Sequence, residues 1–173
     1  MIAKKLIRPS PKASDAPPIR RGPRLVYARD NARAGDHTAA SDNDSATPAR
    51  LLIVEDDFLV ALAAEAALQE AGFDVIGTVG NAEDAIAVAK AQRPSLVIMD
   101  VRLSGRRDGI DAAIELFRHH SIPCVFASAH ADAEARARAT PAEPRGWLQK
   151  PYSMPDLVTL VRQVVDELDK DGR

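Results

Sequence analysis

The chain is poor in cysteine and in aromatic residues. Its 173 residues include one cysteine, Cys124, and aromatic side chains make up 4% of the sequence. A single cysteine excludes an internal disulfide framework and a thiolate metal site, and it fits a protein of a reducing cytosol. Cys124 lies within an apolar run, so we interpret it as a small buried hydrophobe.

Long apolar runs are also absent. No stretch approaches the roughly 18 uninterrupted apolar residues of a membrane span. The first 24 residues lack the apolar segment of a secretory signal. The sequence therefore favours a cytoplasmic protein without a membrane partner.

Charge and proline content divide the chain into two regions. The net charge is -2, yet residues 1–50 hold ten Lys and Arg against five Asp and Glu. Residues 1–49 contain six of the twelve prolines and no apolar periodicity, so they cannot bury enough surface to offset the entropy of ordering. We predict a disordered, basic, proline-rich extension over 1–49 and one folded domain over 50–171. The extension would touch DNA only nonspecifically, through phosphates.

From residue 51 onward, short apolar runs alternate with alanine-rich helical stretches, which predicts β-α units around a parallel sheet. Most runs are continuous in Val, Ile and Leu, as expected of strands that helices cover on both faces. Asp57 and Asn81 are suitable helix N-caps. The predicted strands are 51–55, 74–79, 96–100, 124–128 and 147–150. The predicted helices are 57–71, 81–92, 109–119, 130–139 and 153–168. The fold class is therefore α/β, a doubly wound sheet of five parallel strands with five helices.

Four of these apolar runs lead to a polar residue at their carboxyl end. These residues are Asp56, just after the first run, Asp100, Ser128 and Lys150. The carboxyl ends of parallel strands meet along one edge of a sheet, where ligands bind in open α/β folds. Glu55 would add a third carboxylate, and like charges this close raise one another's pKa unless a group such as a hard cation neutralises them.

These residue types predict a site for Mg²⁺ and a phosphoryl group. Mg²⁺ prefers oxygen ligands and retains several waters, so Asp56 and Asp100 suffice, with Glu55 acting through water. Lys150 supplies a compensating positive charge, and Ser128 can donate its hydroxyl proton to a phosphoryl oxygen. Asp100 is then the best nucleophile, because carboxylates accept phosphoryl groups when a metal screens the charges.

Several motifs resemble the receiver domain of bacterial two-component response regulators. The resemblance extends over residues 51–170 and implies a flavodoxin-like fold. The matching motifs are L-L-I-V-E-D-D, L-V-I-M-D-V-R-L, D-G-I-D-A-A-I-E-L, F-A-S-A and W-L-Q-K-P-Y-S.

The resemblance implies a role for each matching residue at the metal. Asp100 would accept a phosphoryl group from the phosphohistidine of a histidine kinase or a histidine phosphotransfer protein. Asp56, Asp100 and the backbone carbonyl of Arg102 would bind Mg²⁺, and Glu55 would assist.

The resemblance also implies a conformational switch. Ser128 and Lys150 would hold the phosphoryl oxygens, and Ser128 would move toward them. Trp147 occupies the position of an aromatic residue that turns inward in this family, which remodels the face made by the fourth helix, fifth strand and fifth helix. An unidentified target protein would bind this face, and homodimerisation there is left open. Tryptophan replaces the usual tyrosine or phenylalanine, and Ser128 replaces the commoner threonine.

We therefore predict a stand-alone receiver that signals by partner binding and is not an enzyme, since only 23 residues follow Lys150. The main alternative is a receiver-like adaptor that works without phosphorylation. A phosphohydrolase of the haloacid-dehalogenase type would need an acid two residues after Asp100, where Arg102 stands. A transcription factor would need room for a helix-turn-helix after the domain.

Overall fold

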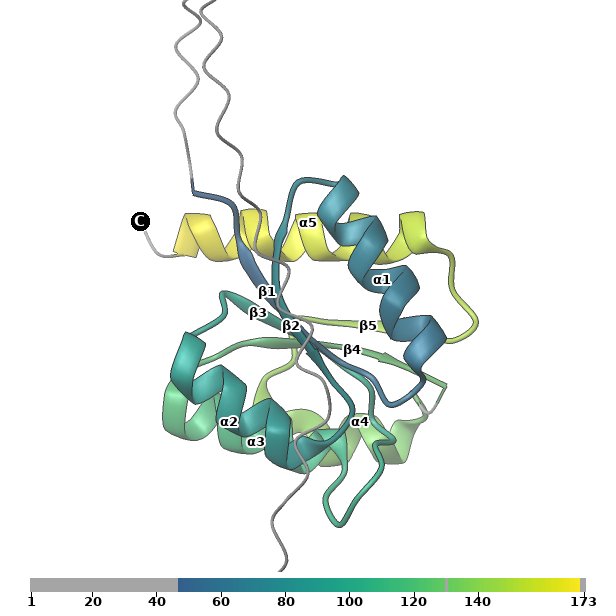
Figure 1. Cartoon of the computed structure of the whole chain (residues 1–173). Coiled ribbons are helices and arrows are strands. Elements are labelled where there is room, and N and C mark those ends of the chain that lie inside the picture. Colours follow the sequence, from purple (N-terminus) through teal and green to yellow (C-terminus); the bar gives the residue numbers. More distant parts are fainter. Residues whose placement is uncertain (1–46, 130, 172–173) are drawn as a thin grey trace, which may run out of the picture. The chain divides into compact units, whose positions relative to one another are not determined.

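One five-stranded sheet forms the centre of the structure, and helices cover both of its faces (Figure 1). The structure is a computed structural model that describes residues 47–129 and 131–171. The architecture is the doubly wound, flavodoxin-like fold that the sequence predicts. The predicted extension over residues 1–49 lies outside the described residues, apart from residues 47–49.

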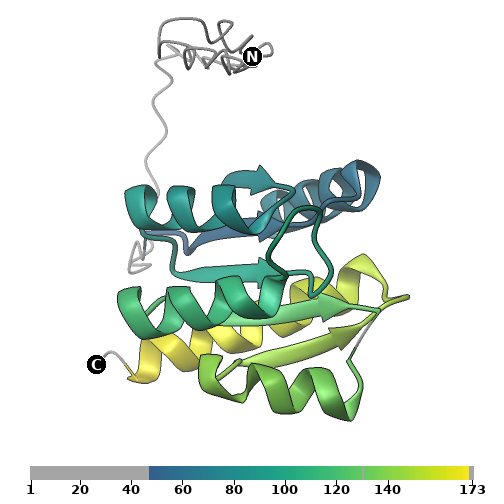
Figure 2. The same cartoon turned by 90° about the horizontal axis from the view of Figure 1, so that it is seen from below.

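All five strands are parallel, and their common direction can be followed in Figure 2. Their order in the sheet is β2-β1-β3-β4-β5, so the order reverses between β1 and β3. Ligands bind at such a reversal, outside the carboxyl ends of the strands. The strands are β1 (Arg50–Val54), β2 (Asp74–Val79), β3 (Leu96–Met99), β4 (Cys124–Ser128) and β5 (Gly146–Gln149).

The helices connect consecutive strands, and α5 follows the last one. Among the residues that the structure describes, none of the helices has both the length and the apolar content needed to cross a membrane. The helices are α1 (Phe58–Glu70), α2 (Ala82–Gln92), α3 (Gly109–His120), α4 (Ala133–Ala139), continued by the 3₁₀ turn η1 (Thr140–Ala142), and α5 (Met154–Asp171).

Side-chain caps start the helices, as the sequence predicts for α1 and α2. Asp57 accepts hydrogen bonds from two backbone N–H groups of α1, and Asn81 accepts one from α2. The prediction for α4 was wrong at its start: the helix begins at Ala133, because Asp132 caps it by accepting from the N–H of Ala135 at 2.8 Å. Residue 130, where we expected it to begin, lies outside the described part of the chain.

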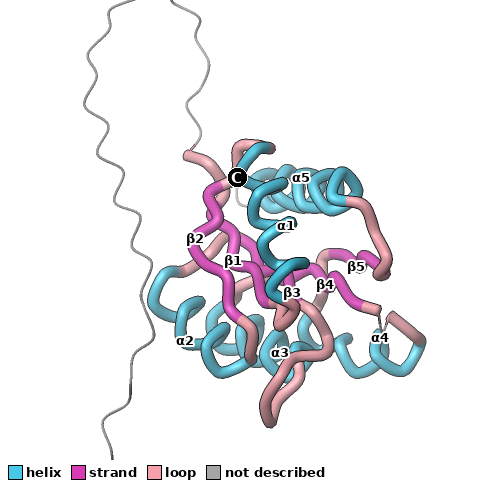
Figure 3. The backbone as a smooth tube through the Cα atoms, turned by 45° about the vertical axis from the view of Figure 1, so that its right-hand side comes forward, coloured by secondary structure: helices cyan, strands magenta, loops and turns pink. Residues whose placement is uncertain are grey.

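Two apolar cores lie on opposite faces of the sheet. Helices α1 and α5 pack on one face, and α2, α3 and α4 pack on the other, so the strands are enclosed between them (Figure 3). Successive residues of β1 alternate between the two cores: Leu51 and Ile53 face α1 and α5, whereas Leu52 and Val54 face α2 and α3. Burial on both faces explains why this strand is apolar at every core position.

Candidate functional site

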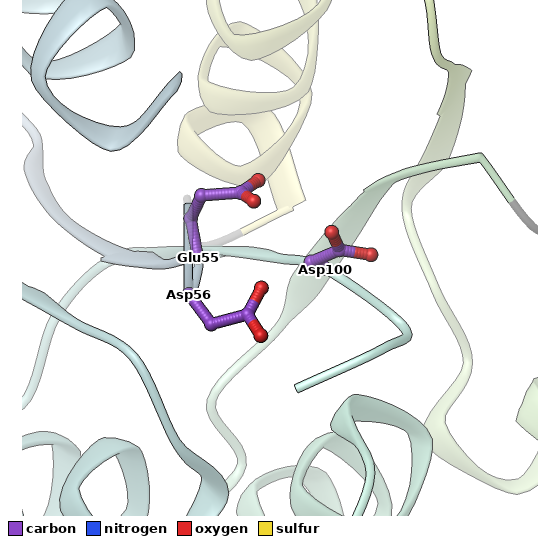
Figure 4. A group of neighbouring side chains, drawn as sticks. All are labelled: Glu55, Asp56 and Asp100. Atoms are coloured by element: carbon purple, nitrogen blue, oxygen red, sulfur yellow. The ribbon is translucent and has the colours of Figure 1, made fainter. Parts of the chain in front are cut away.

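Three carboxylates meet at the carboxyl ends of β1 and β3. Glu55 and Asp56 directly follow β1, and Asp100 directly follows the adjacent β3. One carboxylate oxygen of each residue lies within 4.8 Å of the others, and Figure 4 shows the three side chains together. Glu55 and Asp100 are buried, whereas Asp56 is exposed. The strand order therefore joins two separate segments in one acidic cluster.

Backbone hydrogen bonds hold these residues in place. The N–H of Glu55 donates to Val79 of β2, and the N–H of Asp100 donates to Val54 of β1, both at 2.9 Å. The predicted strands included Glu55 and Asp100, and the observed strands end one residue earlier. The ladder of hydrogen bonds nevertheless continues through both residues, which fixes the backbone from which their side chains project.

Lys150 lies between two of the carboxylates. Its Nζ is 2.5 Å from Oε2 of Glu55 and 2.6 Å from Oδ2 of Asp100. The Lys150 side chain is 21% exposed, and those of Glu55 and Asp100 are 6% and 9% exposed. Water therefore screens these ion pairs only weakly. The backbone N–H of Lys150 also donates to the carbonyl of Ser128 at 3.0 Å, which attaches it to β4.

Burial and charge act against each other in this cluster. Burial raises the pKa of Glu55 above its usual 4.5, although the hydrogen bond and the charge of Lys150 lower it. Burial alone would lower the pKa of Lys150. Its hydrogen bonds to Asp100 and Glu55 outweigh that effect, so the pKa of Lys150 rises above 10.5. Lys150 is therefore a stable positive charge at neutral pH.

Sequence reasoning missed the role of Gly109 beside Asp100. This glycine begins α3, and its N–H donates to the carbonyl of Val101 at 2.8 Å. A Cβ at this position would overlap the carbonyl oxygen of Asp100 and crowd Met99. The Asp-Gly pair at the start of the predicted helix was the available signal, because glycine allows such a close backbone approach.

The loop after Asp100 folds back onto its carboxylate. The backbone N–H of Arg102 donates to Oδ1 of Asp100 at 3.1 Å. The Arg102 backbone thus lies beside the acidic cluster, and its side chain is exposed. Its carbonyl as a metal ligand stays a prediction.

Ser128 and Trp147 lie on the adjacent strands β4 and β5. Ser128 is fully buried at the end of β4. Trp147 is opposite Phe126 in the strand register, and their rings stack with centroids 4.5 Å apart and planes at 27°. The guanidinium of Arg136 in α4 lies 4.9 Å from the centroid of the Trp147 ring, a contact that sequence reasoning did not anticipate.

The donor atoms fit a Mg²⁺ ion. Carboxylate oxygens are its preferred protein ligands, and it retains waters in an octahedral shell. Three carboxylates face one ammonium group here, so a divalent cation would complete the charge balance. Asp56 is exposed, which gives the ion and its waters access from solvent.

A comparison with known families identifies this arrangement. The sequence model of the response regulator receiver domain matches residues 51–162, which is more than half of the chain. The chain belongs to this family. Receiver domains are signalling proteins of two-component systems, and they generally bind Mg²⁺ at an acidic pocket.

Curated relatives agree with the receiver assignment. The chain is 37% identical over 125 residues to the transcriptional regulatory protein PdtaR of Mycobacterium tuberculosis, an alignment that covers 72% of this chain and 60% of PdtaR. It is 29% identical over 133 residues to the phyllosphere-induced regulator PhyR of Methylorubrum extorquens, covering 76% of this chain and 47% of PhyR. The receiver region thus spans about half the length of these relatives.

Solved receiver structures share the fold. The signal receiver domain of a modulated diguanylate cyclase from Desulfovibrio desulfuricans superposes with a TM-score of 0.66 at 30% identity, covering 72% of this chain and 98% of that domain. A CheY-like receiver domain from Methanospirillum hungatei gives a TM-score of 0.68 at 20% identity, covering 72% and 99%. At that identity the second likeness concerns the fold alone.

Proposed function

We propose that Asp100 accepts a phosphoryl group from the phosphohistidine of a histidine kinase or a histidine phosphotransfer protein. The observation that carries this proposal is the position of Lys150, whose Nζ contacts the carboxylates of Asp100 and Glu55. Both belong to the acidic cluster that also includes Asp56. A buried carboxylate paired with a cation beside a metal-compatible cluster is suited to receive a charged group.

The transfer would exchange one bond to phosphorus for another. An Asp100 oxygen attacks phosphorus, the bond from phosphorus to the imidazole nitrogen breaks, and the imidazole leaves with the electron pair. Mg²⁺ held by Asp56, Asp100 and the Arg102 carbonyl, with Glu55 assisting, would supply screening between the negative groups. Lys150 would move from the Asp100 carboxylate to a phosphoryl oxygen, because its Nζ already lies within hydrogen-bond distance of that carboxylate.

The aspartyl-phosphate would then shift the domain between two conformations. Ser128 and Lys150 would contact the phosphoryl oxygens, and Trp147 would report the change on the face made by α4, β5 and α5. A swing from 1:99 to 99:1 requires about 5.5 kcal/mol of differential interaction. Contacts of a doubly charged phosphoryl group with a hydroxyl and an ammonium are suitable sources of this energy.

The surface beside the site supports a protein as the phosphoryl donor. Helix α1 starts next to the acidic cluster, and its first residues carry the large apolar side chains that are exposed in the described part of the chain. Phe58 and Leu59 are each 73% exposed, and Leu62 is 52% exposed. We infer that the donor protein docks on these apolar side chains, which would align its histidine with Asp100.

The output of the switch would be a protein interaction rather than catalysis. An unidentified target would bind the α4-β5-α5 face after phosphorylation, and a second copy of the chain could compete for the same face. We assign no specific DNA binding, no membrane binding and no enzymatic turnover to the chain, and we place it in the cytoplasm. Mg²⁺ is the only cofactor of this proposal.

Phosphorylation by acetyl phosphate tests the proposal directly. Wild-type protein with Mg²⁺ should incorporate labelled phosphate, and the label should be lost in Asp100→Ala and after chelation of Mg²⁺. Asp166→Ala removes an exposed carboxylate from α5 and should retain full labelling. Deletion of residues 1–49 should leave labelling intact.

Two results would contradict the proposal. Equal labelling of Asp100→Ala and wild-type protein would refute Asp100 as the acceptor. If the folded wild-type protein incorporates no labelled phosphate, and beryllofluoride with Mg²⁺ leaves its tryptophan fluorescence unchanged, the phosphorylation-independent adaptor becomes the better hypothesis.

A further inference from the structure

Arg136 connects two parts of the proposed switch. Its guanidinium lies 4.9 Å from the centroid of the Trp147 ring, and its Nε donates to the backbone carbonyl of Ala131 at 3.0 Å. Ala131 belongs to the segment that leads from Ser128 to α4. One side chain therefore joins this segment to the half-buried aromatic residue of β5.

The charge of Arg136 is directed to the ring rather than to an acid. Within the described residues, Arg138 of the same helix pairs with Asp108, whereas Arg136 forms no ion pair. A guanidinium over an indole ring is attracted by the negative face of the ring, most strongly so for tryptophan. Trp147 thus contacts both the ring of Phe126 and the guanidinium of Arg136.

We propose that Arg136 is a positioning residue that holds Trp147 in the resting conformation and thereby sets the threshold of the switch. The inference rests on the proposed function, because it concerns how the phosphorylated state reaches the α4-β5-α5 face. If Ser128 moves toward a phosphoryl group, the segment that carries Ala131 shifts with it. The guanidinium then cannot keep both contacts, so activation releases the Trp147 ring.

The expected effect follows from the strength of the contact. Arg136 is exposed, and cation-π contacts at exposed sites change an equilibrium by about two- to fivefold. Loss of a contact made only in the resting state shifts the population toward the active state by that factor. The active state then requires less of a phosphoryl mimic to become dominant.

The test compares Arg136→Met with wild-type protein in a titration of beryllofluoride at fixed Mg²⁺, followed by the fluorescence of Trp147, the only tryptophan. The midpoint should fall about two- to fivefold. Acrylamide should also quench the resting fluorescence of the variant more strongly, because one contact of the ring is gone. Arg136→Lys keeps the charge without the planar group and should give an intermediate midpoint.

Arg145→Met is the matched control. It removes a guanidinium beside β5 that pairs with Asp171 instead of a ring, and it should titrate like the wild type. One outcome would overturn the inference and leave the proposed function standing. In that outcome the wild-type protein is labelled at Asp100 and responds to beryllofluoride, and both Arg136 variants have the same midpoint and the same quenching as the wild type. No label and no response in the folded wild type would overturn both.

Discussion

Replacing Lys150 with methionine tests the electrostatic balance of the site. The substitution retains the length of the side chain but leaves Glu55 and Asp100, 6% and 9% exposed, without their shared cation. Removing one partner of a buried ion pair costs about 3–5 kcal/mol. Because Lys150 is 21% exposed and the neighbouring Asp56 is open to solvent, we expect a loss at the lower end of this range, about 3 kcal/mol at neutral pH.

The loss should depend on pH in a defined direction. Burial already raises the pKa of Glu55 above 4.5, and Lys150 opposes that rise. Without Lys150 the pKa rises further, so folded Lys150→Met binds more protons than its unfolded chain above pH 4.5. Its free energy of unfolding therefore falls as pH rises through this window, and the deficit relative to wild type is smallest near the unfolded pKa.

Urea unfolding followed by circular dichroism, with EDTA present, measures the effect. Lys90→Met is the control, because Lys90 is exposed on α2, and its free energy of unfolding should stay within about 0.5 kcal/mol of wild type. Mg²⁺ at about a hundred times its Kd should restore about 2.7 kcal/mol to Lys150→Met. Equal stability of Lys150→Met and wild type at neutral pH without metal would refute the reasoning.

Three further predictions concern other parts of the structure. Gly109→Ala should lower the free energy of unfolding, measured in urea titrations, by about 1–3 kcal/mol or more. The reason is that the Cβ of the new alanine would overlap the Asp100 carbonyl. Hydrogen bonds from Ser153 at the start of α5 lower the pKa of Asp156 below 3.8. Asp156→Asn should therefore be less stable than wild type at neutral pH, with the gap closing as pH falls through the folded pKa. Burial raises the pKa of Cys124 to about 12, so a thiol reagent should modify it only after urea is added; rapid modification of the native protein would contradict this.

Local signals in the sequence were sufficient for most of the fold. Continuous apolar runs indicated strands covered on both faces, and Asp57 and Asn81 were recognised as caps because capping depends on neighbours within one turn. The predicted start of α4 at residue 130 was wrong, because Asp132 caps this short helix and the helix begins at Ala133. Propensity alone does not decide which of several polar residues becomes the cap.

The site was predictable in its residue types but not in its contacts. Glu55, Asp56, Asp100 and Lys150 stood out because each follows an apolar strand. The ion pairs of Lys150 join residues 95 and 50 positions apart, and no local pattern specifies such distances. Gly109 was missed because its requirement arises from a backbone that approaches it in space.

By itself, the sequence determined which chemical groups end each strand and that the strands are parallel and covered by helices, since both are written in local polarity and periodicity. Only the tertiary structure decided that β1 lies beside β3, which brings Asp56 close to Asp100. It also decided that Lys150, which follows β5, contacts the carboxylates of both Glu55 and Asp100. It also decided that Arg136 lies over Trp147. Strand order and helix packing are non-local, because they follow from burying two apolar cores at once rather than from any single segment.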